Sequence, residues 1–360
     1  MSELYIGVMS GTSLDGIDVT LCEIDEHSCE LRTSAEYPFP KKLKEEILDI
    51  ISNTTTLQNI GTLHSKLGDL YAKTINKFLD EKKLEFSSVT AIGLHGQTLW
   101  HSPNSEYPFS MQLGCPNIVS TQTGIQVVAD FRSMDIANGG EGAPFAPAFH
   151  QFVFGSLDEK IAVVNIGGMA NITLLGKELK GWDTGVGNAL MDYWVHKCSG
   201  QNYDEDGVFA ELGSINQELL KSFLADDYFK KLPPKSTGRE YFNDTWLKNY
   251  LQTSPNIKDK DIQRTLLELT AITITQALKN TDINLLVVCG GGVKNKFLMQ
   301  RLQELSPSKV KSSDELGVSS DFMESMAFAW LAYKRFHRSE VKLSSVTGAR
   351  KNSILGGIYG

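Results

Sequence analysis

Three glycine-rich turns can do chemistry, because each follows a short apolar run and places backbone amides close together. They are Gly11-Thr12-Ser13-Leu14-Asp15-Gly16, Gly167-Gly168-Met169-Ala170-Asn171 and Gly290-Gly291-Gly292. Without a Cβ, backbone N–H groups can approach phosphate oxygens closely. Glycine also supplies the positive φ of an ordinary tight turn, which is the simpler interpretation of any one of them. Together, the three turns favour binding of a nucleoside triphosphate.

Two other phosphate-binding motifs are excluded by residue identity. A Walker A loop ends in Gly-Lys-Ser/Thr, which does not occur in the sequence. A dinucleotide fingerprint begins at Gly185-Val186-Gly187, but Leu190 occupies the position of its third glycine.

Predicted strands and helices position these turns. Strands are expected over 4–9 and 17–24 around the first turn, over 160–166 and 172–175 around the second, and over 284–289 before the third. Helical spacing of apolar residues covers most of 40–83, 189–196, 206–229, 261–278 and 295–305. The same order of hairpin, helices and strand–glycine junction occurs once in each half of the chain. This repeat predicts two related α/β domains that face each other across a cleft.

Composition limits the partners and the compartment. A length of 360 residues predicts about two domains. The 35 Lys and Arg against 43 Asp and Glu give a net charge of −8 without a basic cluster, which argues against nucleic acid as a partner. The five cysteines form no C-x-x-C pair, and no apolar stretch reaches the roughly 20 residues of a membrane span. No leader is evident at the first residues, so we expect a cytoplasmic protein with no membrane partner.

The sequence resembles the anhydro-N-acetylmuramic acid kinases over essentially its whole length. The resemblance begins at Val8-Met9-Ser10-Gly11-Thr12-Ser13-Leu14-Asp15-Gly16-Ile17-Asp18. It continues, in the family's order, through Gly96-Gln97-Thr98, Val128-Ala129-Asp130-Phe131-Arg132, Gly142-Ala143-Pro144, Asn165-Ile166-Gly167-Gly168, Asp183-Thr184-Gly185, Pro233-Pro234-Lys235-Ser236-Thr237-Gly238-Arg239-Glu240, Cys289-Gly290-Gly291-Gly292, Ser345-Val346-Thr347-Gly348-Ala349 and Leu355-Gly356-Gly357-Ile358-Tyr359.

This resemblance implies the actin/hexokinase/sugar-kinase ATPase fold, built from two ribonuclease H-like α/β domains with a cleft between them. We expect an N-terminal domain of 1–130 plus about 341–360, and a C-terminal domain of 131–340. It also implies a homodimer that acts in peptidoglycan recycling. The implied reaction uses ATP and Mg²⁺ to phosphorylate O6 of 1,6-anhydro-N-acetylmuramic acid while water opens the anhydro bridge at C1.

Water attack at an anomeric carbon needs a general base, and Asp183 is the residue we assign to it. It follows Gly181-Trp182 in what reads as a glycine-flanked turn. The alternative is an Asx-turn, or an N-cap for the helix expected over 188–196.

The nucleotide would be bound mainly by backbone amides. The residues expected to contact it are Gly11, Thr12, Ser13, Leu14, Asp15, Gly16, Ile17, Asp18, Gly167, Gly168, Asn171, Gly290, Gly291 and Gly292, the last three at the adenosine end. Asp15 is the expected Mg²⁺ ligand, through water, because a hard cation prefers oxygen donors. Asp18 is the weaker alternative, and no role follows for the block Thr237-Gly238-Arg239-Glu240.

Three residues are expected to contact the sugar. Arg132 can bind the lactyl carboxylate with two parallel hydrogen bonds, or else pair with Asp130 or Asp135. His95 can hydrogen-bond sugar or water, or serve as a structural donor. Glu324 can reach the site, although a first-turn glutamate is also favoured by the helix dipole.

The sequence departs from the family pattern at Leu94, Cys115, Glu141 and Val186, and none of these removes an assigned group. Two other functions stay open from the residues alone. One is a glycoside-type hydrolase without phosphoryl transfer, which the phosphate-type turns argue against. The other is a non-catalytic nucleotide-gated module, which an intact Asp183 argues against.

Overall fold

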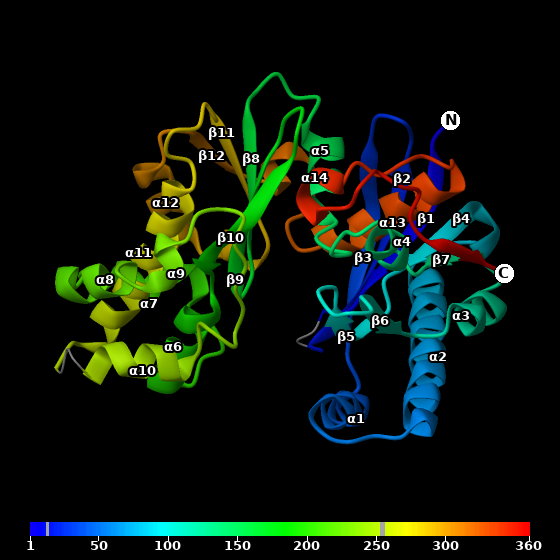
Figure 1. Ribbon diagram of the computed structural model, residues 1–360, viewed down its shortest axis with the longest axis horizontal. Helices are drawn as coiled ribbons and strands as arrows, with labels where there is room; N and C mark the ends of the chain where they lie inside the picture. The colour runs from blue at the N-terminus through cyan, green and yellow to red at the C-terminus, as the bar shows by residue number, and fades with distance from the viewer. Residues whose placement is uncertain (12–13, 253–255) are drawn as a thin grey trace. The chain divides into compact units, whose positions relative to one another are not determined.

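The computed structural model describes residues 1–11, 14–252 and 256–360, and its internal contacts divide the chain into two compact units (Figure 1). Unit 1 comprises Met1–Val153 and Phe322–Gly360, and unit 2 comprises Phe154–Asp321. These bounds differ from the expected domains in two stretches, 131–153 and 322–340, which lie in unit 1. The second stretch contains helix α13 (Met323–Phe336), which packs on the sheet of unit 1.

Unit 1 is built on a six-stranded sheet in the order β13-β7-β4-β1-β2-β3. Its strands are β1 (Glu3–Met9), β2 (Gly16–Ile24), β3 (Cys29–Pro38), β4 (Val89–Leu94), β7 (Val127–Ala129) and β13 (Gly357–Tyr359). A separate two-stranded sheet is formed by β5 (Gln97–Ser102) and β6 (Phe109–Leu113). The centre of β1 and all but one residue of β4 are buried, as expected for apolar runs in the middle of a sheet.

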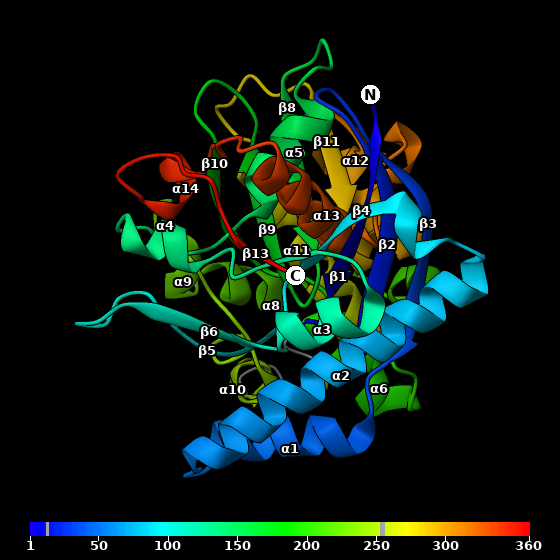
Figure 2. The ribbon, with the colours of Figure 1, turned by 90° about the vertical axis from the view of Figure 1, so that its right-hand side faces the viewer.

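Helices α2 (Leu57–Lys82), α3 (Pro116–Thr123) and α13 contact the strands of this sheet. The other helices of unit 1 are α1 (Lys41–Ser52), α4 (Ser133–Ala137), α5 (Ala146–Phe154) and α14 (Ser344–Thr347), with a 3-10 turn, η1, at Phe86–Ser88. Figure 2 shows the long helix α2 with α1 and α3 beside it. Apolar residues recur along one face of α2, and Leu63, Leu67 and Ile75 are completely buried in the unit 1 core.

Unit 2 is built on a five-stranded sheet in the order β10-β9-β8-β11-β12. Its strands are β8 (Ile161–Ile166), β9 (Met169–Leu174), β10 (Lys180–Val186), β11 (Leu285–Cys289) and β12 (Lys309–Ser312). Its helices are α6 (Ala189–Ser199), α7 (Val208–Glu211), α8 (Gln217–Leu224), α9 (Asp227–Lys230), α10 (Asp244–Gln252), α11 (Asp259–Gln276) and α12 (Lys296–Leu305), with 3-10 turns η2 (Glu205–Gly207), η3 (Gly291–Lys294) and η4 (Asp314–Leu316).

The two main sheets repeat one topology. In each, three consecutive strands form an antiparallel meander, and the first of them also pairs in parallel with the fourth strand of the series. Helices separate the third strand from the fourth in both units. The predicted fold class is therefore confirmed as two related α/β units, and the repeat seen in the sequence is a repeat of strand order.

Two glycines in the unit 1 sheet let a helix approach its strands closely. A Cβ at Gly7 in β1 would overlap the backbone carbonyl of Ser325, and a Cβ at Gly93 in β4 would overlap that of Phe328. Both carbonyls belong to α13, which also carries Glu324. These glycines thus fix the position of a helix that bears an expected site residue.

Over the described ranges, every helix is either too short or too polar to span a membrane.

Candidate active site

Asp183 lies within strand β10, not in the glycine-flanked turn that the sequence predicts. Its Cα pairs with that of Asn171 on β9, and a bulge follows between Asp183 and Gly185. A bulge redirects the side chains next to it, and bulges are common beside active sites. The half-buried Asp183 caps no helix, because Asn188 is the residue at the N-terminus of α6.

The segment Lys235–Glu240, called the 235–240 segment below, holds Asp183 through its backbone and its carboxylate. The backbone N–H of Thr237 donates to Oδ2 of Asp183 at 2.8 Å, and the Ser236 hydroxyl donates to the same oxygen at 3.1 Å. The Asp183 N–H donates in turn to the Lys235 carbonyl at 3.0 Å. On the other side, the Tyr228 hydroxyl donates to the Asp183 carbonyl at 2.7 Å.

These contacts leave the two carboxylate oxygens of Asp183 unequal. Oδ2 accepts two hydrogen bonds, whereas no described residue donates to Oδ1. Burial raises the pKa of Asp183; the Thr237 N–H and the Ser236 hydroxyl oppose this rise, and the negative charge of Glu240 adds to it. A carboxylate with a raised pKa and one unoccupied oxygen suits proton abstraction from water.

The second glycine turn is joined to the start of helix α6. The N–H groups of Gly187 and Ala189 donate to the Gly168 carbonyl at 2.9 and 3.1 Å, and that of Asn188 donates to the Gly167 carbonyl at 2.8 Å. Gly167 uses its own N–H within the turn, toward the Met169 carbonyl at 3.1 Å. Because the N–H of Gly167 already donates within the turn, it is not available to a phosphate oxygen in this conformation.

The third glycine run packs against the same end of β8. A Cβ at Gly292 would lie 2.5 Å from the Ile166 side chain, and one at Gly291 would lie 3.6 Å from the Asn188 amide. A pocket of about 260 Å³ opens here, lined by Asn188, Met191, Asp192, Tyr203, Asp204, Gly291, Lys294 and Asn295. The second turn and the third run, far apart in sequence, thus meet beside one pocket within unit 2.

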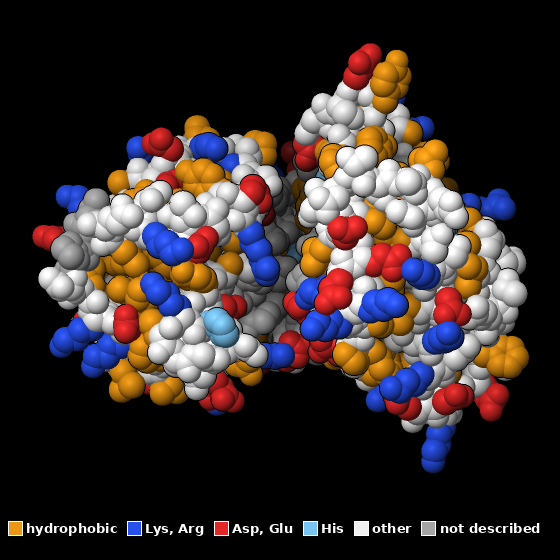
Figure 3. Space-filling model, turned by 90° about the horizontal axis from the view of Figure 1, so that it is seen from below, with side chains coloured by type: hydrophobic (Ala, Val, Ile, Leu, Met, Phe, Trp, Pro, Cys, Tyr) orange, Lys and Arg blue, Asp and Glu red, His pale blue; other side chains and the backbone are white. Residues whose placement is uncertain are grey.

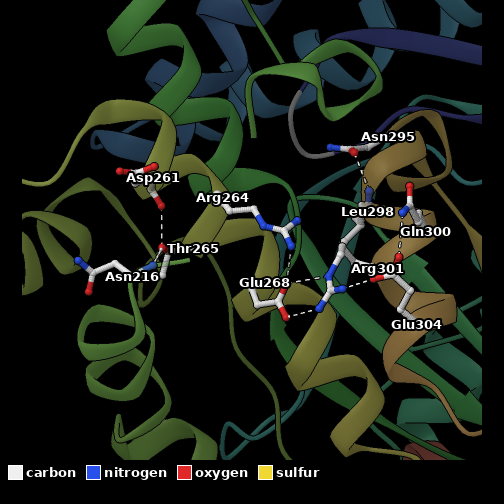
Figure 4. Close-up of polar contacts among 10 residues, drawn as sticks. All are labelled: Asn216, Asp261, Arg264, Thr265, Glu268, Asn295, Leu298, Gln300, Arg301 and Glu304. Carbon is white, nitrogen blue, oxygen red and sulfur yellow. Dashed lines mark hydrogen bonds and ion pairs between the residues drawn. The ribbon is translucent and has the colours of Figure 1, made fainter. Parts of the chain in front are cut away.

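A buried ionic network fixes the helix that follows the third glycine run (Figure 4). The Glu268 carboxylate on α11 accepts two hydrogen bonds from Arg301 on α12, at 3.0 Å from Nε and 2.8 Å from Nη2. Arg264, one turn before Glu268, lies 3.5 Å from it. Asn295 caps α12 by accepting from the Leu298 N–H at 2.8 Å. Since Asn295 also lines the pocket, the network holds the pocket wall in place.

The first glycine turn lies in unit 1, and Thr12 and Ser13 fall outside the described residues. The Leu14 N–H donates to the Gly11 carbonyl at 3.2 Å. The side chains of Leu14 and Ile17 are buried in the unit 1 core, so only their backbones are available to a ligand. Gly16 opens β2 and Asp18 lies within it.

Asp15 offers one exposed carboxylate at this turn, and Lys44 forms an ion pair with it at 3.0 Å. Mg²⁺ that keeps most of its waters and contacts phosphate needs only one or two protein carboxylates. The donor chemistry of Asp15, with Asp18 on the adjoining strand, therefore fits Mg²⁺. No set of three or more His, Cys, Asp or Glu residues in the described parts of the chain is arranged to hold a metal ion by itself.

His95 and Arg132 form a hydrogen-bonded pair in unit 1. His95 follows β4, and Arg132 stands at the N-terminus of α4. Nη2 of Arg132 lies 2.8 Å from Nε2 of His95, and Nη1 donates to the Gly142 carbonyl at 2.8 Å. Because a guanidinium only donates, Nε2 of His95 must accept, so the imidazole is neutral. Burial and the Arg132 charge lower the pKa of His95 to about 3, which agrees with that assignment.

Glu324 supplies a charge near this pair from the first turn of α13. Burial lowers the pKa of Arg132 to about 10, and the negative charge of Glu324 opposes this shift. The surrounding protein raises the pKa of Glu324, and Arg132 opposes that rise, although part of the Glu324 side chain remains exposed. Arg132 therefore stays cationic at neutral pH.

The alternative ion pairs of Arg132 with Asp130 or Asp135 do not form among the described residues. Asp130 accepts from the Ser133 hydroxyl at 2.6 Å. The buried Asp135 accepts from the Gly142 N–H at 2.8 Å and from the Thr347 hydroxyl at 2.9 Å. Arg132 thus keeps Nε as a donor that no described residue uses.

Charge on the molecular surface is mixed in sign. Figure 3 shows Lys and Arg side chains interspersed with Asp and Glu side chains over the visible face. Binding of an anionic ligand must therefore depend on placed groups and backbone amides more than on a general basic surface.

The sequence predicted no role for the 235–240 segment and did not single out Tyr228, although both contact Asp183. The run Ser236-Thr237-Gly238-Arg239-Glu240 after two prolines is a polar loop signal, but its partner is 53 residues away in sequence. Only the folded chain shows that this loop and β10 meet.

Comparison with known proteins gives one family. The family model described as "Anhydro-N-acetylmuramic acid kinase" matches residues 3–360. The chain is 57% identical over 367 residues to the anhydro-N-acetylmuramic acid kinase of Sulfurimonas denitrificans, covering 100% of both chains. It is 52% identical to that of a Sulfurovum species, with 99% of each chain covered, and 48% identical to that of Vibrio vulnificus, with 99% and 98% covered. The chain belongs to the anhydro-N-acetylmuramic acid kinase family and is a carbohydrate kinase.

Proposed function

We propose that the chain converts 1,6-anhydro-N-acetylmuramic acid, ATP and water into N-acetylmuramic acid 6-phosphate and ADP. The observation that carries the proposal is the carboxylate of Asp183, which has a raised pKa, two donors on Oδ2 and an Oδ1 to which no described residue donates. Membership of the family supports the same substrates. The product places this activity in peptidoglycan recycling.

The reaction requires a base that takes a proton from water, and O6 must leave C1 and bond to the γ-phosphorus. Asp183 takes one proton from water through Oδ1, and the water oxygen bonds to C1. The C1–O6 bond breaks, and O6 keeps its electron pair and bonds to the γ-phosphorus of ATP. The bond from that phosphorus to the bridging oxygen breaks, and ADP leaves with the pair. Asp183 then releases its proton to solvent.

Each unit contributes different groups to this reaction. In unit 2, the turn at Gly167, Gly168 and Asn171 binds the phosphates of ATP, and the pocket beside Gly290, Gly291 and Gly292 binds its adenosine group. In unit 1, residues 11–18 also bind the phosphates. Arg132, oriented by His95 and the Gly142 carbonyl, binds the lactyl carboxylate, with Glu324 beside it.

Asp15 would hold Mg²⁺ through water, with Asp18 as the alternative. When bound, the ion neutralises phosphate charge. The Asp15 side chain is exposed, and Lys44 forms an ion pair with it at 3.0 Å.

A reducing compartment suits this chain, since all five cysteines are free thiols. We therefore place the reaction in the cytoplasm. The homodimer implied by the family stays a prediction, and light scattering of the purified chain tests it.

Incubation of the purified chain with ATP, Mg²⁺ and the anhydro sugar tests the proposed function. We expect one ADP and one sugar 6-phosphate per turnover, identified by mass spectrometry. Formation of unphosphorylated N-acetylmuramic acid would indicate a hydrolase. Nucleotide binding without any sugar product would indicate a non-catalytic module.

A further inference from the structure

The most informative residue without a role is Arg239, which lies against the second glycine turn of unit 2. A Cβ built at Gly168 would lie 3.3 Å from both Nε and Nη2 of Arg239. The guanidinium therefore lies beside Gly168, at the tip of the β8–β9 hairpin. A Cβ at this position would require the guanidinium to shift by a few tenths of an ångström.

The Arg239 guanidinium makes no close polar contact with the described residues. Arg239 is exposed, and it forms no hydrogen bond or ion pair with any residue of 1–11, 14–252 or 256–360. The carboxylate of the neighbouring residue Glu240 lies beside Gly238, because a Cβ built at Gly238 would overlap it. An unpaired guanidinium beside a glycine turn has the donors that a phosphoryl group needs.

Arg239 also lies close to the pocket beside the third glycine run. Burial raises the pKa of Asp192, which lines that pocket, to about 6, and the positive charge of Arg239 opposes the rise. Arg239 is thus near both the turn assigned to phosphates and the pocket assigned to the nucleoside.

The 235–240 segment connects this cation to the base. Ser236 and Thr237 donate to the Asp183 carboxylate, and Arg239 follows two residues after Thr237. One short loop therefore holds the group that activates water and carries the cation at the glycine turn.

We propose that Arg239 is a catalytic residue that donates hydrogen bonds to the γ-phosphoryl oxygens of ATP as the phosphoryl group moves to O6. The inference rests on the proposed function. In that step the bond from γ-phosphorus to the bridging oxygen breaks as the O6–phosphorus bond forms, and ADP carries away the electron pair. Arg239 transfers no proton in this step and stabilises the charge on the three γ-phosphoryl oxygens whose bonds to phosphorus persist.

The test compares Arg239→Gln with Arg239→Lys and with the control Arg32→Gln. Arg32 is a half-exposed arginine paired with Glu23 on the edge of the unit 1 sheet, outside the proposed machinery. Three quantities are measured for each protein: kcat with ATP and the anhydro sugar, affinity for ADP, and affinity for ADP with aluminium fluoride, which mimics the phosphoryl group in transfer.

We expect Arg239→Gln to lower kcat by about 100-fold or more, as for other cations at transferring phosphoryl groups. Its affinity for ADP should match the wild type, while the gain in affinity from aluminium fluoride should be lost. Arg239→Lys should recover part of kcat and part of the gain in affinity from aluminium fluoride, because lysine restores the positive charge but not the paired donors of a guanidinium. Arg32→Gln should match the wild type throughout.

Two results would overturn the inference. One is a kcat of Arg239→Gln close to that of the wild type. The other is a loss of affinity for ADP that is equal with and without aluminium fluoride. The second result would assign Arg239 to nucleotide positioning. Retained ADP binding shows in the same experiment that the variant is folded. Failure of the proposed function is distinguishable, since the wild type itself would then form no 6-phosphate.

Discussion

The carboxylate of Asp183, the proposed base, is held by a loop. The side-chain and backbone donors of the 235–240 segment contact only Oδ2, so in the proposed reaction the proton from water goes to Oδ1. These donors also stabilise the ionised form and so limit the rise in pKa that burial causes. The segment thus sets both the orientation and the basicity of the proposed base.

Removing one donor should shift the pH dependence in a definite direction. Ser236→Ala deletes the hydroxyl that favours ionised Asp183, so the pKa of Asp183 should rise further. The base must be ionised, and the acid limb of kcat/KM against pH should therefore move to higher pH. Ser222→Ala on α8, whose hydroxyl donates to the Leu219 carbonyl, is the matched control. An acid limb that stays in place or moves to lower pH contradicts this account.

Arg132 should determine affinity for the anionic sugar. Arg132→Gln removes a cation whose hydrogen bonds to a carboxylate typically contribute about 1.5–3 kcal/mol each. We expect KM for the anhydro sugar to rise about 10-fold or more, with ATP affinity unchanged.

A sugar without the lactyl group gives the decisive comparison for Arg132. For 1,6-anhydro-N-acetylglucosamine, the wild type and Arg132→Gln should have the same KM. If Arg132→Gln raises KM for that sugar by the same factor as for the natural sugar, Arg132 does not bind the lactyl carboxylate.

At the residue scale, the types of the site residues could be read from the sequence, but their partners could not. Asp183 and Arg132 stand in recognisable motifs. The neutral state of His95 depends on Arg132, 37 residues away, and the donors to Asp183 are more than 50 residues away. Such pairings arise only when the sheets and helices assemble.

At the scale of elements, an aromatic cluster supports the strand that carries Asp183. Asp226, at the start of α9, accepts hydrogen bonds from the Tyr241 hydroxyl at 2.7 Å, the Trp246 indole at 2.9 Å and the Tyr250 hydroxyl at 2.9 Å. It also caps α9 through the Tyr228 N–H at 2.8 Å. Since Tyr228 donates to the Asp183 carbonyl, Asp226 connects α9 and α10 to β10.

Asp226→Asn should destabilise unit 2. Burial alone would raise the pKa of Asp226, but hydrogen bonds from Tyr241, Tyr228, Trp246 and Tyr250 outweigh it and lower the pKa. The folded pKa lies below the unfolded one, so this stabilisation is present at neutral pH and is lost as pH falls through the folded pKa. Loss of hydrogen bonds to a charged acceptor suggests a decrease of about 2 kcal/mol in the free energy of unfolding at pH 7.

Urea unfolding of Asp226→Asn beside Asp227→Asn measures this effect. Asp227 is adjacent and pairs with Lys230 on the surface, so its replacement should change the free energy of unfolding little. The difference between the two variants should shrink at acid pH. Equal stability of the two variants at pH 7 contradicts the assigned role of Asp226.

Strands with apolar runs were predictable, and polar strands were not. The expected strands over 4–9, 17–24 and 284–289 correspond to β1, β2 and β11. By contrast, β3 carries polar side chains at the edge of its sheet, and β10 contains Asp183 between two glycines. These strands form because a neighbouring strand is available for pairing, and tertiary context overrides weak local preference.

At the scale of the whole molecule, the chain of 360 residues carries proposed binding groups in both of its units. Both units use the same strand order, and in each a glycine-containing connection joins the first two strands. Unit 2 carries the proposed base and the proposed nucleoside pocket, whereas unit 1 carries the His95–Arg132 pair. With a net charge of −8, the chain must bind anions through these placed groups.

The central claim is that Asp183 activates the water that opens the ring while the phosphoryl group moves to O6. The most direct measurement is a rapidly quenched reaction in ¹⁸O-enriched water, comparing the wild type with Asp183→Asn. The wild type should place ¹⁸O at C1 and none in the transferred phosphate. Asp183→Asn should bind ATP normally and lose product formation by at least about 100-fold. Label in the phosphate, or a rate for Asp183→Asn near that of the wild type, would contradict the claim.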